Sequence, residues 1–117
     1  MTGATGARTA LRVLVTGGAG FIGRHVVRAL QECGHEVTVV DTTASPDDVP
    51  GVVGDLCDPA VQESAVVAGT DAVVHLAAQT SVLGSIARPA LVHRTNVEAT
   101  AGLLERVREC SVGCFAL

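Results

Sequence analysis

The stretch Leu11–Leu30, LRVLVTGGAGFIGRHVVRAL, limits what this chain can fold into, because it joins an apolar strand to an amphipathic helix through glycines. Residues Arg12–Val15 predict a strand, and apolar side chains at helical spacing predict a helix that begins near Phe21. Backbone N–H groups and the positive end of the helix dipole meet at such a turn, so we expect it to bind phosphate. The apolar side chains expected on the inner face of this helix are Ile22, Val26, Val27 and Leu30.

Three glycines give the turn the spacing GxxGxxG, and each is expected to have its own task. Gly17 permits the tight turn, Gly20 lets a pyrophosphate approach the backbone, and Gly23 lets the helix pack closely on the strand. A second apolar strand, Glu36–Val40, is followed by Asp41, which lies 18 residues after Gly23. This is close to the separation of about 20 residues at which a carboxylate binds the ribose hydroxyls of NAD. A purely structural glycine turn is the alternative.

The charges after Asp41 favour NAD over NADP. The 2′-phosphate of NADP needs a cation near the end of the second strand, but no Arg or Lys follows Asp41 until Arg88. A carboxylate in that position would repel the phosphate.

Length and composition predict one domain with an aliphatic core. The chain has 117 residues, of which 48% are hydrophobic and only 2% aromatic, as in a parallel sheet covered on both faces. A net charge of −4 without a basic cluster argues against nucleic-acid binding. We expect no membrane span, no signal peptide and a cytoplasmic location. Metal ligation is not expected either, because the cysteines lack zinc-site spacing and read as free thiols: Cys33, Cys57, Cys110 and Cys114.

Strands alternate with helices along the rest of the chain, which predicts a doubly wound parallel α/β sheet of about five strands. Residues 1–10 read as a flexible tail and residues 11–117 as the domain. After the second strand we expect a strand at Val52–Val53, a helix from Pro59 to about Ala68, a strand at Ala72–Leu76, a helix from Pro89 to about Glu109 and a partial strand within Val112–Leu117. The inner stripe expected on the longest helix is Val97, Thr100, Leu103, Leu104 and Val107.

Four motifs in order give the sequence a family resemblance over residues 11–117. It resembles the N-terminal part of an extended short-chain dehydrogenase/reductase, in particular the NAD-dependent epimerase/dehydratase family that acts on nucleotide sugars. That resemblance implies an incomplete Rossmann-type fold. The motifs are TGGAGFIG at Thr16–Gly23, GDLCD at Gly54–Asp58, HLAAQTSV at His75–Val82 and TNVEAT at Thr95–Thr100.

The resemblance assigns roles to several side chains. It places Asp55 against the adenine amino group and Leu56 against the ring face, whereas the alternative for Asp55 is a turn cap. Asn96, expected to face the sheet, either helps to hold the active-site backbone or is a satisfied core amide. The candidate cofactor-binding residues are Gly17, Gly20, Phe21, Ile22, Gly23, Asp41, Asp55, Leu56, Leu76, Ala77, Ala78 and Asn96, and the candidate substrate contacts are Thr80 and Ser81. His75 reads as a packing residue at a strand end, and the histidines expected at the surface are His25, His35 and His93.

The chemistry of the family needs groups that this sequence does not contain. A Tyr-x-x-x-Lys pair and a Ser or Thr perform it, but the chain has no Tyr and no Lys, so no catalytic residue is expected here. We expect a truncated NAD-binding portion without its C-terminal substrate domain, which would meet a nucleotide sugar only when completed by that part. The alternatives are a non-catalytic NAD-binding module or regulator and an unstable remnant. A homodimer through the 89–109 helix is a further expectation.

Overall fold

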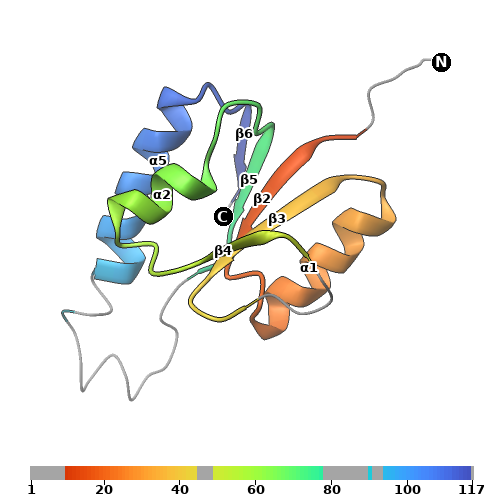
Figure 1. The fold of residues 1–117 in the computed structure, drawn as a ribbon, viewed down its shortest axis with the longest axis horizontal. Helices are drawn as coiled ribbons and strands as arrows, with labels where there is room; N and C mark the ends of the chain where they lie inside the picture. Colours follow the sequence, from red (N-terminus) through yellow and green to blue (C-terminus); the bar gives the residue numbers. More distant parts are fainter. Residues whose placement is uncertain (1–9, 45–48, 78–89, 91–93, 117) are drawn as a thin grey trace.

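The computed structural model describes residues 10–44, 49–77, 90 and 94–116 (Figure 1). Most of the expected tail over residues 1–10 therefore lies outside the described residues. The strands are β2 (Arg12–Thr16), β3 (Glu36–Asp41), β4 (Gly51–Val53), β5 (Ala72–His75) and β6 (Cys114–Ala116). The helices are α1 (Phe21–Glu32), α2 (Pro59–Ala65), the π-helix η1 (Arg94–Glu98) and α5 (Ala99–Glu109).

The five strands form one parallel sheet in the order β4-β3-β2-β5-β6, which confirms the predicted fold class. From β2 the chain moves outward to β3 and β4, and then crosses back to place β5 on the other side of β2. The strand order therefore reverses between β2 and β5. In open α/β sheets, ligands bind beyond the carboxyl ends of the strands at this reversal.

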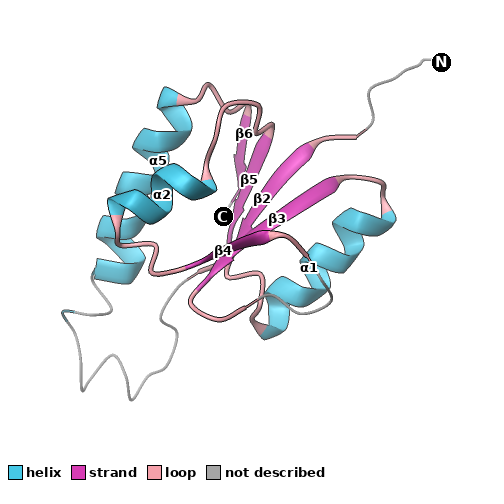
Figure 2. Cartoon of the chain, viewed as in Figure 1, coloured by secondary structure: helices cyan, strands magenta, loops and turns pink. Residues whose placement is uncertain are grey.

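Helices cover both faces of the sheet, with α1 on one side and α2 with α5 on the other (Figure 2). Successive side chains of each strand point to opposite faces of the sheet, so the strands contribute to an apolar layer on each face. The α1 side buries Val13, Val15, Val27, Val37, Val39 and Ala72. The opposite side buries Leu14, Val40, Leu56, Ala65, Val66, Val73, Ala99, Leu103 and Val107.

Helix α1 begins and ends where the sequence predicts. Gly34 has a φ of +90°, and the N–H groups of Gly34 and His35 donate to the carbonyls of Gln31 and Leu30. These two bonds form the Schellman motif that closes a helix. The predicted inner face is wrong at Ile22, which is 65% exposed, because the first turn of α1 extends past the apolar layer that buries Val27.

Helix α2 is shorter than predicted. It ends at Ala65 rather than near Ala68, and Val66 has an extended backbone with a φ of −100° and a ψ of 106°. The Val66 side chain is fully buried in the core between α2, α5 and the sheet. A β-branched residue loses little in leaving the helix, and its burial stabilises the extended conformation.

The predicted 89–109 helix has two kinds of winding in its described part. Residues 94–98 are π-helical, and α5 begins at Ala99. The Thr100 hydroxyl donates to the Asn96 carbonyl at 3.2 Å where the winding changes, and side-chain bonds of this kind disturb the regular ladder. Asn96 is exposed, so the expectation that it faces the sheet is wrong.

The predicted inner stripe of the 89–109 helix is only partly correct, and Thr100 within it is half-buried. Leu103 and Val107 are buried as expected, but Val97 is 53% and Leu104 is 44% exposed. The face of α5 that carries Gly102 lies against α2. A Cβ atom on Gly102 would come within 2.7 Å of the Gln62 amide nitrogen. Close helix packing at a glycine therefore selects the buried face.

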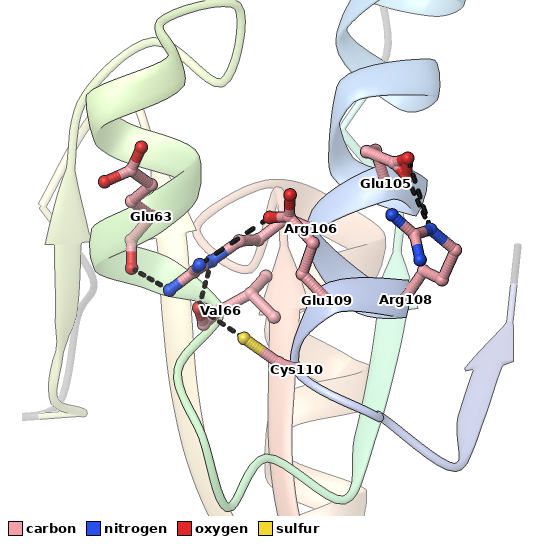
Figure 3. Close-up of polar contacts among 7 residues, drawn as sticks. All are labelled: Glu63, Val66, Glu105, Arg106, Arg108, Glu109 and Cys110. Atoms are coloured by element: carbon pink, nitrogen blue, oxygen red, sulfur yellow. Dashed lines mark hydrogen bonds and ion pairs between the residues drawn. The ribbon is translucent and has the colours of Figure 1, made fainter.

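Arg106 of α5 joins the two helices by capping α2 (Figure 3). Its Nε donates to the Val66 carbonyl at 2.9 Å and its Nη2 to the Glu63 carbonyl at 3.3 Å. These carbonyls belong to the end of α2, whose own last turn carries no basic residue. A cation at this position also faces the negative end of the helix dipole.

We expect Arg106→Met to lower the free energy of unfolding by about 2 kcal/mol, because two helix-end carbonyls lose a charged donor. Urea denaturation followed by circular dichroism measures this loss. The matched control is Arg108→Met, since Arg108 bonds only the exposed Glu105 carboxylate among the contacts drawn in Figure 3. The control should leave the midpoint almost unchanged. Equal losses in both variants would contradict the capping role.

Candidate functional site

The glycine turn joins β2 to α1 at the carboxyl edge of the sheet. Gly17 has a φ of +72°, as the prediction for a tight turn requires. Its N–H donates to the Val40 carbonyl at 2.9 Å, so the turn is tied to β3. A Cβ atom on Gly17 would also lie 2.9 Å from the Ala77 backbone N, which leaves no room for any other residue. Gly17 thus serves both the turn and the contact with the segment after β5.

Gly20 leaves the N-terminus of α1 open. It is the N-cap of the helix, has no side chain to cap it, and is followed by no acidic residue in the first turn. The nearest heavy atom to a Cβ placed on Gly20 would be the Gly17 carbonyl oxygen at 3.4 Å. The first-turn N–H groups of a helix lack partners within the helix and attract anions. This arrangement fits a bound phosphate group.

Two further glycines hold the turn in shape. A Cβ atom on Gly23 would overlap the Gly17 carbonyl oxygen, so this glycine lets the helix pack closely on the turn, whereas the sequence predicted packing on the strand. A Cβ atom on Gly18 would come within 2.6 Å of the Val39 side chain. The sequence reasoning missed Gly18, although the pair Gly17-Gly18 directly after a buried strand was visible as a signal.

Asp41 ends β3 beside this turn. Its Oδ2 accepts from the Ala19 N–H at 3.0 Å, and its Oδ1 accepts from the Thr43 N–H at 3.3 Å. The carboxylate is half-buried and lies at the same edge as the glycines. The structure therefore brings together the two features that the sequence pairs across 18 residues, Gly23 and Asp41.

Asp55 and Leu56 follow β4 at the same edge but differ in burial. Asp55 is exposed, and its Oδ1 accepts from the Cys57 N–H at 2.8 Å, which is the turn cap considered as its alternative role. Leu56 is only 8% exposed and packs in the core with Val40. Because little of its side chain is left to meet a ring, a nucleotide contact by Leu56 would come from its backbone.

The segment after β5 borders the turn from the other side. The N–H groups of Leu76 and Ala77 donate to the Thr16 hydroxyl at 3.0 and 3.1 Å. Both residues are half-buried. The other candidates on this segment, Ala78, Thr80 and Ser81, lie outside the described residues, as does His93.

His75 does more than pack at a strand end. The residue is 7% exposed, its Nδ1 lies 2.6 Å from the Thr16 hydroxyl, and its Nε2 lies 2.8 Å from the Thr100 hydroxyl. Burial lowers the pKa of His75 below its usual 6.5, because desolvation disfavours the charged imidazole. The sequence carried one signal for this network, since two polar residues end neighbouring buried strands.

Other site classes find little support in the part of the chain that the structure describes. No three His, Cys, Asp or Glu side chains there are grouped so as to hold a metal ion. None of the helices described is long and apolar enough to cross a membrane.

Of the histidines expected at the surface, His25 is exposed and His35 is half-buried.

Comparison with known proteins gives the same family from sequence and from structure. The NAD dependent epimerase/dehydratase family model matches residues 13–116. A dTDP-glucose 4,6-dehydratase of Streptomyces niveus is 39% identical, over 90% of this chain and 36% of the relative. A UDP-glucose 4-epimerase of Corynebacterium glutamicum is 36% identical, over 84% of this chain and 31% of the relative.

A solved structure extends the similarity to three dimensions. The UDP-glucose 4-epimerase of Thermus thermophilus, crystallised in complex with NAD, matches with a TM-score of 0.78 and 39% identity, over 87% of this chain and 35% of that one. The chain thus spans about a third of the length of these relatives, at 31% to 36%. With the fold, the open glycine turn and these matches in agreement, the chain belongs to the NAD-dependent epimerase/dehydratase family.

Proposed function

We propose that this chain forms the NAD-binding portion of an epimerase or dehydratase that acts on nucleotide sugars. The observation that carries the proposal is the uncapped N-terminus of α1, with Gly20 open and the Asp41 carboxylate at its side. The similar epimerase of Thermus thermophilus was crystallised with NAD. NAD, when bound, accepts and returns a hydride; the residues of this chain bind and orient it.

We give the name nucleotide crevice to the proposed NAD site around the glycine turn, Asp41 and the Leu76–Ala77 segment, and each part of it has a distinct task. The first turn of α1, including Phe21 and Ile22, offers backbone N–H groups to the pyrophosphate. Asp41 accepts hydrogen bonds from the adenosine ribose, and Asp55 accepts one from the adenine amino group while it caps its own turn. Leu76 and Ala77 border the nicotinamide half. Ala78 and Asn96 remain candidates for cofactor binding, and Thr80 and Ser81 remain candidates for contacts with the sugar.

Acid–base chemistry on the sugar is not assigned to any residue here, because the chain has no Tyr and no Lys. A nucleotide sugar would be a partner only together with a C-terminal part that supplies those groups. The same composition supports the second candidate, a non-catalytic NAD-binding module. Turnover of a sugar nucleotide by this chain alone would contradict both assignments. A proposed cytoplasmic location agrees with the four cysteines, all of which lie in the described part of the chain and none of which forms a disulfide.

We expect Gly20→Val to weaken NAD binding at least about tenfold while the fold is kept, because the side chain enters the open crevice and not the core. Calorimetric titration and circular dichroism measure the two effects. Gly113→Val is the matched control, since a Cβ there would have only the Asp71 carbonyl near it, at 3.7 Å, at the other edge of the sheet. Gly23→Ala should instead lower stability. Unchanged NAD affinity in Gly20→Val would place the site elsewhere.

We expect Asp41→Asn to reduce the preference for NAD over NADP at least about tenfold, since the repulsion of the 2′-phosphate is removed. Competition binding with both dinucleotides gives the ratio. Asp71→Asn serves as the control, because Asp71 accepts from the Arg12 N–H at the opposite edge of the sheet, at 2.8 Å. A ratio that Asp41→Asn leaves unchanged would rule out this carboxylate as the selecting group.

The 89–109 segment supports a homodimer as a further proposal. Val97 and Leu104 are exposed apolar side chains on its described part, and Ala101 lies exposed between them. We expect sedimentation equilibrium to show a dimer that Leu104→Glu weakens at least about tenfold, because a charge would be buried at the contact. Gln31→Glu, on the exposed side of α1, should have no effect. A monomer at all concentrations would overturn the proposal.

A further inference from the structure

A polar network with a buried end, the pair Thr16 and His75, lies next to the proposed nucleotide crevice. Thr16 is fully buried at the end of β2, and the strand register pairs it with His75 at the end of β5. From His75 the network continues to Thr100 of α5 and then to the Asn96 carbonyl of η1. The network thus connects β2 and β5, the two strands between which the sheet order reverses, with α5.

The donor and the acceptor of each hydrogen bond in the network are fixed. The Thr16 oxygen accepts from the N–H groups of Leu76 and Ala77 and so uses both lone pairs. Its proton must therefore point to His75 Nδ1, 2.6 Å away. His75 is then neutral with its proton on Nε2, which donates to the Thr100 hydroxyl at 2.8 Å, and Thr100 donates to Asn96.

A second proton on the imidazole would break this order. Nδ1–H would become a third donor aimed at the Thr16 oxygen, which has only two lone pairs. Leu76 N–H has another acceptor, the Thr16 carbonyl at 3.1 Å, whereas the described contact of Ala77 N–H is with the hydroxyl alone. The bond from Ala77 is therefore the one that protonation displaces.

The displaced bond lies next to the glycine turn. The Ala77 backbone N is the atom that approaches Gly17 so closely that a Cβ has no room. We propose that His75 is a positioning residue for the nucleotide crevice: its neutral Nε2–H form holds the Leu76–Ala77 segment against the Gly17 turn, and its protonation releases that segment and weakens NAD binding. The link to NAD rests on the function proposed above.

The groups around His75 determine the pH range in which its neutral form holds the Leu76–Ala77 segment. Among the described residues, the groups that contact the imidazole are the hydroxyls of Thr16 and Thr100 and the ring of Phe115 on β6, whose centroid is 5.9 Å away. None of them ionises near neutral pH, and within the described ranges burial alone lowers the pKa of His75 below 6.5. The neutral form therefore holds above that pH, and the positioning contact is lost as the pH falls through the lowered pKa.

Nuclear magnetic resonance on the ligand-free 117-residue chain tests the network without NAD. We expect the ¹⁵N imidazole signals of His75 to show the neutral Nε2–H tautomer, and the Ala77 amide signal to titrate with the same pKa as the imidazole. An Nδ1–H tautomer, or an Ala77 amide that does not respond while His75 titrates, would overturn the proposal.

Calorimetric titration with NAD between about pH 5.5 and about pH 8 tests the consequence for binding. The affinity should fall by up to about tenfold per pH unit below the pKa of His75. His75→Asn, which keeps an acceptor for Thr16 but has no proton to gain, should remove this slope. The matched control is His35→Asn, because His35 accepts from the Leu11 N–H at the other edge of the sheet. An equal slope in His75→Asn would overturn the proposal.

Two variants of Thr16 separate positioning from packing. Thr16→Val keeps the shape but removes the acceptor for Ala77, so NAD binding should weaken at all pH values. Thr16→Ser should restore both affinity and pH slope, and failure of this rescue would count against the network. If the chain binds no NAD at any pH, the proposed function is wrong while the Ala77 titration still decides the role of His75. If His75→Asn does not fold, the Ala77 titration likewise decides the role of His75.

Discussion

The close approach of two backbones, where β2 and β5 end side by side, is the constraint on which the rest of this structure depends. Gly17 and Ala77 leave no space between them for a Cβ atom, and the buried Thr16 hydroxyl binds both N–H groups of the Leu76–Ala77 segment. This contact lies at the carboxyl edge of the sheet where the strand order reverses, which is where we propose that NAD binds. The glycine turn, α1 and the segment after β5 are therefore held in position together.

The strands and the glycine turn could be predicted because their signals are local. A buried parallel strand is a short apolar run that ends at a polar residue or a glycine, as at Thr16 and Asp41. A glycine with positive φ, such as Gly17 or Gly34, marks a change of direction that few other residues allow. The meeting of the turn and Asp41 then follows from topology, since parallel strands place their carboxyl ends at one edge.

The helix faces and the hydrogen-bond partners of His75 could not be predicted, because both depend on packing between distant segments. Periodicity finds an apolar stripe, but the contact of Gly102 with Gln62 decides that Leu103 rather than Leu104 is buried. Ile22 belongs to an apolar stripe that extends beyond the layer available to cover it. The pairing of His75 with Thr16 requires the strand register, and its contact with Thr100 requires the position of α5.

A crevice built from backbone groups has a particular weakness. Few of its contacts can be removed by changing a side chain, so its geometry depends on whatever fixes the backbone beneath it. Here that support is the Thr16 hydroxyl, whose two lone pairs are both available to the Leu76 and Ala77 N–H groups only while the adjacent His75 ring accepts the hydroxyl proton. We therefore expect the buried His75 to affect binding at the proposed site more strongly than the exposed Asp55, whose carboxylate caps its own turn.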